Sequence, residues 1–336
     1  MKNKVFKQKF SMILILTILM TLFTFNNVFA TENQTEEYIP IRTAEDLAAI
    51  GENLESLKGK YILMEDIDLK GVDWTPIGDQ YNGFMGIFDG NYHVIENLTI
   101  NSPTESNLGL FGRVNKFTET PKILNLGLVN VNIVGKDYIG GIAGSINGSI
   151  VENCYATGVI NYNEIKGLSQ SGFGGLIGVS YNSEIYNSYS NVTVNGKSGV
   201  GGLIGYLQNG SIVENCYSDG EVNGDRYVGG LIGDVEQAEI YNSYSNATVI
   251  GEPSKTGGLI GTIGSGSIVE NCYSDGDVDG DVEVGGFAGT ISNDSIVKNC
   301  YSDGDVDGSY RVGGFVGVNE GSITNCYSIG NVSYAM

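Results

Sequence analysis

The chain has 336 residues, a formal net charge of −21, 50 glycines, 5 prolines and 41% hydrophobic residues. A chain this acidic repels nucleic acid and anionic membrane surfaces, so we expect neither as a partner. The hydrophobic content excludes a disordered chain, and abundant glycine with little proline indicates many tight turns between short strands.

Residues 1–30 are predicted to be a secretory signal peptide. Four lysines precede an apolar run from Met12 to Phe25, and a small-residue cleavage site ends at Ala30. The apolar run is short for a bilayer core of about 30 Å, which favours a cleaved signal peptide. The alternative is an uncleaved anchor helix. We therefore expect cleavage after Ala30, a secreted or cell-surface location, and no membrane insertion after signal cleavage.

Residues 31–57 are predicted to form a linker and a capping helix. The segment Thr43–Asp46 resembles a capping box, and three apolar residues follow it at helical spacing. These residues are Leu47, Ile50 and Leu54. We expect a helix over 43–56 that covers the open strand edges of the first coil, followed by a first strand over Tyr61–Leu69.

The remaining segment, 58–336, repeats itself about every 28 residues. One marker is a glycine pair followed by two apolar residues and a third glycine, and its first glycine is Gly140, Gly174, Gly201, Gly229, Gly257, Gly285 or Gly313. The second marker is an asparagine, at Asn97, Asn125, Asn153, Asn187, Asn215, Asn242, Asn271, Asn299 and Asn325. Two independent markers with one period indicate stacked structural repeats.

The residues around each asparagine predict how the chain faces the core. Val or Ile stands two positions before it, and small or apolar residues stand one and three positions after it. Strict alternation would place the first two of these columns on opposite faces, so the chain must bend at the asparagine. We expect a buried asparagine that bonds to the turn backbone and to the next coil.

A valine near seven residues after the asparagine marks a second strand, and the glycine pair marks a third. A propeller blade needs four strands in about 40–45 residues, which is more than this period allows. The pattern predicts an all-β fold, namely a right-handed parallel β-helix (β-solenoid) of about ten coils with three short strands each and an N-terminal helical cap. The last marker falls close to Met336, so we expect the solenoid to be incomplete at its C-terminus.

The repeats resemble the GLUG repeat in the segments Gly201–Gly205 and Glu214–Gly220, and the stretches Ile41–Leu47 and Phe88–Ile95 resemble the coils that precede such repeats. The similarity covers roughly residues 38–336 and implies a bacterial secreted or surface protein. Similar repeats occur in the N-terminal regions of immunoglobulin A metallopeptidases. The resemblance does not imply protease activity, because a zinc site of the form His-Glu-x-x-His is missing and His93 is the one histidine.

Three functions are compatible with these patterns. We expect a non-enzymatic repeat module for adhesion or binding, or a spacer, with no catalytic residues and with a host or cell-wall glycan or protein as its partner. One alternative is a carbohydrate-active β-helix enzyme, a polysaccharide lyase or hydrolase, for which Arg226 and Arg311 are the candidate cations in what we interpret as equivalent repeat positions. Another is that the chain is the N-terminal fragment of a larger surface protease or adhesin.

A tyrosine column is the first candidate binding surface. It comprises Tyr155, Tyr189, Tyr217, Tyr244, Tyr273, Tyr301 and Tyr327, each two positions after an asparagine marker. An outward row of aromatic rings binds sugars or a partner protein, and its alternative role is a self-stacking ladder that stiffens the solenoid.

Two acidic turns are candidate calcium sites. They carry Asp275, Asp277, Asp279, Asp303, Asp305 and Asp307, in two runs one repeat apart that match the first half of a calcium loop. The glutamate that completes an EF-hand is missing, so any calcium would bind between stacked coils. The alternative is solvated turn residues, and we expect no other cofactor.

The remaining candidate functional features are the five cysteines and one insertion in the repeat. Cys154, Cys216, Cys272, Cys300 and Cys326 share one interior column, as buried free thiols or as bridges between neighbouring coils. An excess of residues between Asn153 and Asn187 predicts a protruding loop around Tyr162–Gly172, of the kind that often carries binding function.

Overall fold

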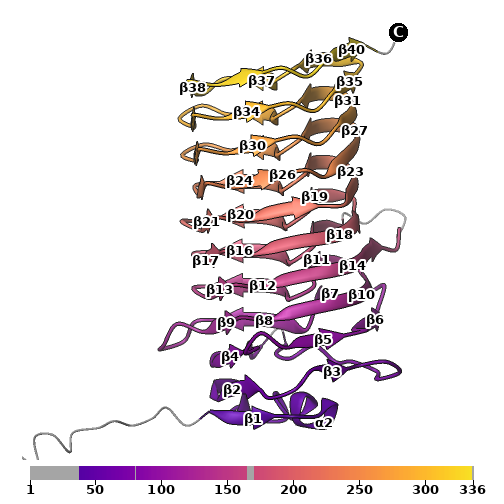
Figure 1. Cartoon of the computed structure of the whole chain (residues 1–336), viewed down its shortest axis with the longest axis vertical. Helices are drawn as coiled ribbons and strands as arrows, with labels where there is room; N and C mark the ends of the chain where they lie inside the picture. Colours follow the sequence, from indigo (N-terminus) through magenta and orange to yellow (C-terminus); the bar gives the residue numbers. More distant parts are fainter. Residues whose placement is uncertain (1–37, 80, 165–169, 335–336) are drawn as a thin grey trace, which may run out of the picture. The chain divides into compact units, whose positions relative to one another are not determined.

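The computed structural model describes residues 38–79, 81–164 and 170–334. From Ile39 onward the chain winds into stacked coils, and every strand pairs in parallel with the equivalent strand of the next coil (Figure 1). The prediction of an all-β parallel solenoid with coils of about 28 residues is confirmed. The predicted signal peptide and residues 31–37 of the linker lie outside the described residues.

Each coil contributes to three parallel sheets, which we call A, B and C. Sheet A has 11 strands: β1 (Ile39–Ile41), β2 (Lys60–Leu63), β4 (Ile87–Asp89), β9 (Lys122–Leu124), β13 (Ile150–Glu152), β17 (Glu184–Tyr186), β21 (Ile212–Glu214), β25 (Glu239–Tyr241), β29 (Ile268–Glu270), β33 (Ile296–Lys298) and β38 (Ser322–Thr324). Sheet C has eight: β8 (Phe111–Asn115), β12 (Ala143–Asn147), β16 (Ile177–Tyr181), β20 (Ile204–Gln208), β24 (Ile232–Glu236), β28 (Ile260–Ile263), β32 (Ala288–Ile291) and β37 (Val316–Asn319).

Sheet B is the widest face and has 21 strands. Its strands are β3 (Ile67–Asp68), β5 (Val94–Glu96), β6 (Thr99–Asn101), β7 (Ser106–Leu108), β10 (Gly127–Gly135), β11 (Asp137–Ile139), β14 (Tyr155–Tyr162), β15 (Ser171–Gly174), β18 (Tyr189–Asn195), β19 (Ser198–Gly201), β22 (Tyr217–Asp219), β23 (Glu221–Gly229), β26 (Tyr244–Ser245), β27 (Thr248–Gly257), β30 (Tyr273–Ser274), β31 (Val278–Gly285), β34 (Tyr301–Ser302), β35 (Val306–Gly308), β36 (Tyr310–Gly313), β39 (Tyr327–Ser328) and β40 (Val332–Tyr334). A coil therefore has three faces, as predicted, but most coils place two strand segments on the second face.

The asparagine marker forms the corner between sheets A and B. All nine marker asparagines have φ between 49° and 60°, the left-handed region in which asparagine is the best tolerated residue after glycine. The predicted bend is confirmed, whereas the predicted burial is wrong. The left-handed turn directs these side chains outward, and Asn215, for example, is exposed.

The columns around that corner pack the interior as predicted. Val213, Cys216 and Ser218, at two before, one after and three after Asn215, are all fully buried. The same columns are buried in the neighbouring coils, because a left-handed residue between two strands lets both flanking positions face inward. In the last coil, Ile323 and Cys326 are only half-buried, because no described coil stacks on them.

The glycine pair lies at the corner between sheets B and C, and the predicted third strand begins within the same five-residue glycine motif. The strand of sheet C begins only after it, as at Ile232 after Gly230. A Cβ on Gly230 would collide with the Gly258 carbonyl of the next coil and with Ser245 Oγ. Ser218 Oγ donates a hydrogen bond to the Gly230 carbonyl across the core. Glycine is therefore required here because backbone meets backbone and a small side chain fills the remaining space.

The third glycine of the motif is required for a different contact. A Cβ on Gly233 would collide with the backbone of Gly199 and Val200, where the preceding coil bulges at a left-handed residue. The second and third glycines of one repeat thus serve two different close approaches between coils.

The N-terminal cap is shorter than predicted. Helix α2 spans only Ala44–Ala48, although its capping box is present, with Thr43 Oγ1 accepting from the Asp46 N–H at 3.1 Å. Gly51, at φ 111°, stops helix continuation, and the 3-10 helix η1 (Ser56–Lys58) follows. Leu47 and Ile50 are buried as expected, but Leu54 is 49% exposed because it lies outside any helix.

The predicted first strand over Tyr61–Leu69 is divided into β2 and β3, because the chain turns there from sheet A to sheet B. Among the described residues, no helix has both the length and the hydropathy to cross a membrane.

Candidate functional site

The tyrosine column forms a continuous stack on the outer face of sheet B. Ring centroids of successive tyrosines lie 4.7–5.0 Å apart from Tyr155 to Tyr301, with interplanar angles of at most 3°. The last pair, Tyr301 and Tyr327, is looser at 5.4 Å and 9°. The column is outward, as predicted, and it is also the self-stacking ladder that we weighed as the alternative. We call it the tyrosine ladder.

Stacking determines which part of each tyrosine a ligand can reach. The inner rings use both faces against their neighbours, so their edges and hydroxyl groups are the parts in contact with solvent. At the N-terminal end Gly127 lies against the ring of Tyr155, and a Cβ there would collide with it. At the other end Tyr327 is 56% exposed. Face-to-face stacking of a sugar ring is therefore geometrically possible at Tyr327, while the inner tyrosines offer hydrogen bonds.

An asparagine ladder runs beside the tyrosine ladder. Nδ2 of every marker asparagine except Asn187 donates to a side-chain oxygen one coil earlier, for example Asn153 to Asn125 Oδ1 at 2.9 Å and Asn299 to Asn271 Oδ1 at 3.2 Å. The predicted bonding from coil to coil is confirmed, although it occurs on the outer surface. Each such bond fixes the register of one coil on the next.

The six candidate calcium aspartates form exposed columns on sheet B, alternating with buried Gly276, Val278 and Gly280. Asp279 pairs with Asp307 in register, and Asp277 Oδ1 accepts the Asp305 N–H at 2.9 Å. Burial, and to a lesser extent the neighbouring Asp303 carboxylate, raises the pKa of Asp275. Within the described ranges, no group of three or more His, Cys, Asp or Glu side chains is gathered closely enough to hold a metal ion. Calcium binding at these turns stays a prediction.

All five cysteines are free thiols, four of them buried and Cys326 half-buried. Cys216 Sγ donates to the carbonyls of Glu214 and, across the coil interface, Ile185. In-register neighbours in parallel sheets are about 4.8 Å apart with side chains pointing the same way, whereas a disulfide needs Cβ atoms about 3.5–4.5 Å apart. The geometry favours the buried-thiol interpretation.

At the predicted loop around Tyr162–Gly172, the strand pairing of the coil is interrupted. Strand β14 ends at Tyr162 and β15 begins at Ser171, and Gln170 Nε2 donates to the Asn163 carbonyl at 2.8 Å at the base of the excursion. Residues 165–169 of this prediction lie outside the described residues.

Our assignment of Arg226 and Arg311 to equivalent positions is wrong. The register runs from Arg226 through Ser254 and Val282 to Tyr310, so Arg311 is one residue out of line with Arg226. Each of these three steps is 28 residues long, whereas Arg311 lies 85 residues after Arg226, one more than three full repeats. Arg311 Nη1 instead donates to Glu283 Oε1, one coil earlier, at 2.9 Å.

A partly buried carboxylate on the outer side of sheet C escaped the sequence reasoning. Asp234 stands in register between Tyr206 and Thr262, and no hydrogen bond or ion pair within the described residues reaches its carboxylate. Burial, with a smaller contribution from Glu236, raises its pKa to about 7, against the opposing effect of Lys255. Thr262 Oγ1 is also buried without a hydrogen-bond partner. No sequence signal marks this position, because its column changes residue type from coil to coil.

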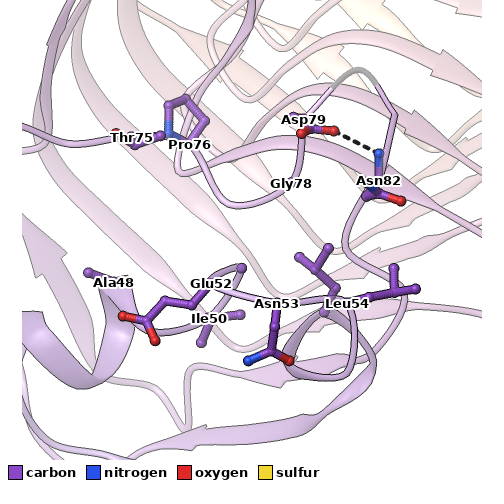
Figure 2. Close-up of a pocket in the computed structure, with 12 residues that line it drawn as sticks. Ala48, Ile50, Glu52, Asn53, Leu54, Thr75, Pro76, Gly78, Asp79 and Asn82 are labelled. Atoms are coloured by element: carbon purple, nitrogen blue, oxygen red, sulfur yellow. Dashed lines mark hydrogen bonds between the residues drawn. The ribbon is translucent and has the colours of Figure 1, made fainter.

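A cavity of about 420 Å³ opens beside the N-terminal cap (Figure 2). Its lining combines apolar Ile50 and Leu54 with the polar side chains of Glu52 and Asp79. Asp79 Oδ1 accepts the Asn82 N–H at 2.7 Å, which fixes the loop above the cavity. The sequence did not predict it, because its lining comes from segments on both sides of β2 and β3.

Comparisons with known proteins agree with this geometry. The family described as the GLUG motif matches residues 137–161, 196–223, 280–307 and 308–333. Halomucin from Haloquadratum walsbyi is 30% identical over 166 residues, which are 46% of this chain and 2% of that protein. The chain thus spans a small part of that relative's length.

Two solved structures are similar to the chain. One, described as a candidate immunoglobulin A1 protease from Bacteroides ovatus, has a TM-score of 0.56 at 20% identity and covers 89% of this chain and 84% of that one. The other, named IgA1 Protease, has a TM-score of 0.49 at 18% identity, with 91% of this chain and 20% of that chain covered. The first likeness shows a shared fold.

The matched segments contain the features that the structure explains. Residues 280–307, for example, include the glycine corner at Gly285 and Gly286 and the interior Cys300 beside the ladder residue Tyr301. The chain therefore carries repeats of the GLUG motif, wound into a parallel β-solenoid.

Proposed function

We propose that the chain is a secreted or cell-surface repeat module that binds a glycan or protein of a host or cell wall and has no catalytic activity of its own. The observation that supports this most directly is the tyrosine ladder. It repeats one hydroxyl group and one ring edge at every coil along a rigid sheet.

The polar residues beside the ladder complement its hydroxyl groups. Two positions after five of the seven ladder tyrosines, the outer face carries Asn191, Asp219, Asn246, Asp275 and Asp303. Asn246 Nδ2 donates to Asp219 Oδ1 at 2.9 Å, so this second column is ordered as well. A surface with donors and acceptors already in place avoids the entropic cost of ordering side chains on binding. It suits an extended ligand whose own hydrogen-bonding groups repeat, such as a polysaccharide or an extended peptide.

Removing the hydroxyl groups without the rings tests this proposal. In the variant Tyr189→Phe/Tyr217→Phe/Tyr244→Phe, the stack remains and its three central hydroxyls are lost. We expect binding of the full chain to a glycan array and to isolated cell-wall polysaccharide to weaken by about tenfold or more, from about 0.5–1.5 kcal/mol for each hydrogen bond. The matched control is Tyr138→Phe/Tyr227→Phe, on another part of the surface.

Other outcomes would point elsewhere. Unchanged binding of the triple variant would show that the hydroxyl groups of the tyrosine ladder do not contact the ligand. Release of unsaturated sugar ends from an acidic polysaccharide would support the lyase alternative and contradict the proposal. N-terminal sequencing of the exported protein tests the predicted cleavage after Ala30.

A further inference from the structure

Most coils place two strand segments in sheet B, and the chain bends between them. At two coils, three steps apart, this bend is irregular. In the first of these coils the chain leaves the stack at Tyr162. Three coils further on, two residues, Glu252 and Pro253, stand between Gly251 and Ser254. The preceding coil has only Asp225 at this point. The two coils between them follow the ordinary repeat, and Tyr162 and Glu252, on the outer two coils, form the two walls of a recess.

The recess has a volume of about 310 Å³. It is lined by Tyr162, Asn195, Gly196, Asn223, Gly224, Asp225, Ile250 and Glu252. Its strands β14, β18, β23 and β27 lie one above another at the same edge of the stack (Figure 1). Three coil steps of about 4.8 Å place the walls about 14 Å apart. The volume is at the lower end of the range of about 300–1,000 Å³ for small-molecule sites.

A second amide ladder ends inside this recess. Asn195 Nδ2 donates to Asn161 Oδ1 at 2.7 Å, and Asn223 Nδ2 donates to Asn195 Oδ1 at 2.9 Å. In the next coil Ile250 takes the place of the asparagine and has no amide to donate. Asn223 uses its other Nδ2 hydrogen on Glu221 Oε1, so its Oδ1 remains an acceptor with no donor among the described residues.

The charged groups of the recess are acceptors as well. Asp225 and Glu252 contribute carboxylates, and none of the lining residues is a lysine or arginine. Lys197, which lies near Asp225, has its ammonium group 3.9 Å from Glu164 Oε1. Partial burial raises the pKa of Asp225. These carboxylates would repel an anionic ligand, an effect that nearby Lys197 and Arg226 reduce, whereas a ligand rich in hydroxyl donors would satisfy the free acceptors.

Apolar surface stands beside these acceptors. Ile250 is 40% exposed, and the Tyr162 ring is held edge-to-face against the buried Phe173 at 6.0 Å. A sugar ring has this combination of needs, because its C–H groups pack on apolar or aromatic side chains while its hydroxyls donate to carboxylates and amides.

We infer that this recess is a binding site for a neutral oligosaccharide, whose hydroxyl groups donate to Asp225, Glu252 and Asn223 Oδ1 while separate sugar rings pack on Tyr162 and on Ile250. The site is separate from the tyrosine ladder and does not depend on the function proposed for it. It is also the kind of place where a repeat protein becomes selective, because the chain departs from the regular repeat after Tyr162 and at Glu252 and Pro253.

Saturation-transfer NMR and titration of the full chain with cellobiose, maltose, lactose and chitobiose test this site. The variants are Asp225→Ala and Tyr162→Ala. The matched control is Asp281→Ala, which removes a carboxylate from the equivalent bend two coils on, outside the walls. We expect at least one neutral disaccharide to bind, with about tenfold or greater weakening in both variants, as for lost hydrogen bonds to a charged group, and no change in the control.

Two further probes make the test decisive. A disaccharide containing glucuronic acid should bind more weakly than its neutral counterpart. Binding by none of the neutral sugars, or equal binding by Asp225→Ala with an unchanged circular dichroism melting curve, would overturn the inference. The triple Phe variant of the ladder should bind these disaccharides like the natural chain, so failure at one site is distinguishable from failure at the other.

Discussion

The rings of Tyr189 and Tyr217 lie 4.7 Å apart with 3° between their planes, and each also stacks on a further tyrosine on its other side. An interior ring of the ladder therefore makes two aromatic contacts, while the terminal Tyr327 makes one. This difference allows the contribution of stacking to stability to be separated from simple burial.

Tyr217→Ala should lower the free energy of unfolding by about 1–3 kcal/mol, because it removes two ring pairs of about 0.5–1.5 kcal/mol each. Tyr327→Ala removes one pair and should cost about half as much. Urea denaturation followed by circular dichroism measures both. Equal effects of the two variants would mean that stacking adds nothing to stability.

Gly230→Ala should be among the most damaging single substitutions in the chain. The added methyl group meets the Gly258 carbonyl and Ser245 Oγ inside a closed core, so the coils must separate, at a cost at or beyond the upper end of about 1–3 kcal/mol. Gly71→Ala is the control, since its Cβ would meet nothing within 4 Å and only its φ of 78° is unfavourable, by about 1–2 kcal/mol. Similar melting temperatures for the two variants would contradict the role of the glycine corner.

Asp234 should make the chain less stable as the pH rises. Its pKa increases from 3.8 to about 7 on folding, so the folded state resists ionisation that the unfolded chain accepts. The free energy of unfolding should fall between about pH 4 and pH 7 and then level off. Asp234→Asn should be more stable than the natural chain at pH 8, by on the order of 2–4 kcal/mol, with the difference vanishing near pH 4. A pH-independent difference in urea midpoints would exclude this explanation.

Thiol alkylation should distinguish the interior of the stack from its last coil. Burial raises the pKa of Cys154 and of Cys216 to about 12, so little thiolate forms at neutral pH. Cys326 is half-buried and should react first with iodoacetamide. Mass spectrometry of the native chain should find Cys216 unmodified until urea is added. Rapid labelling of Cys216 without denaturant would indicate that the coils open locally.

Calcium at the stacked aspartates would screen their mutual repulsion and raise the melting temperature. Asp277→Asn/Asp305→Asn would then remove the effect, whereas Asp219→Asn, two coils from the acidic turns, would retain it. Thermal denaturation with calcium and with EDTA measures the shift. An unchanged melting temperature in both would end the calcium interpretation.

The period and the inward columns could be predicted because each coil repeats the same packing problem. Val213, Cys216 and Ser218 recur in kind at every turn, and a recurring pattern identifies a buried face without any knowledge of its partner. The placement of Asn215 could not be predicted in the same way. A polar residue between two buried positions fits either a buried hydrogen-bonded turn or a left-handed turn facing solvent, and only the observed φ of 56° decides between them.

The features that sequence reasoning missed lie where the coils differ from one another. Arg311 lies one residue beyond Tyr310, the true register partner of Arg226, and the insertion at Glu252 and Pro253 contributes Glu252 to the saccharide recess. Asp234 was overlooked because its neighbours in register, Tyr206 and Thr262, share no chemical type with it. A periodic sequence pattern identifies residues that recur at equivalent positions in every coil. A specific binding site is built from residues that differ between coils, so the pattern does not reveal it.

The in-register columns also have a consequence for how such a chain changes over generations. Since a coil contacts mainly the coils next to it, inserting or deleting one whole coil returns every column to its own register. Unequal recombination between neighbouring repeats in the gene would therefore lengthen or shorten the stack without a folding penalty at the junction. Shifts that are not whole repeats would place glycine corners against side chains. The close packing at the Gly230 corner thus restricts changes in the length of the stack to whole repeats.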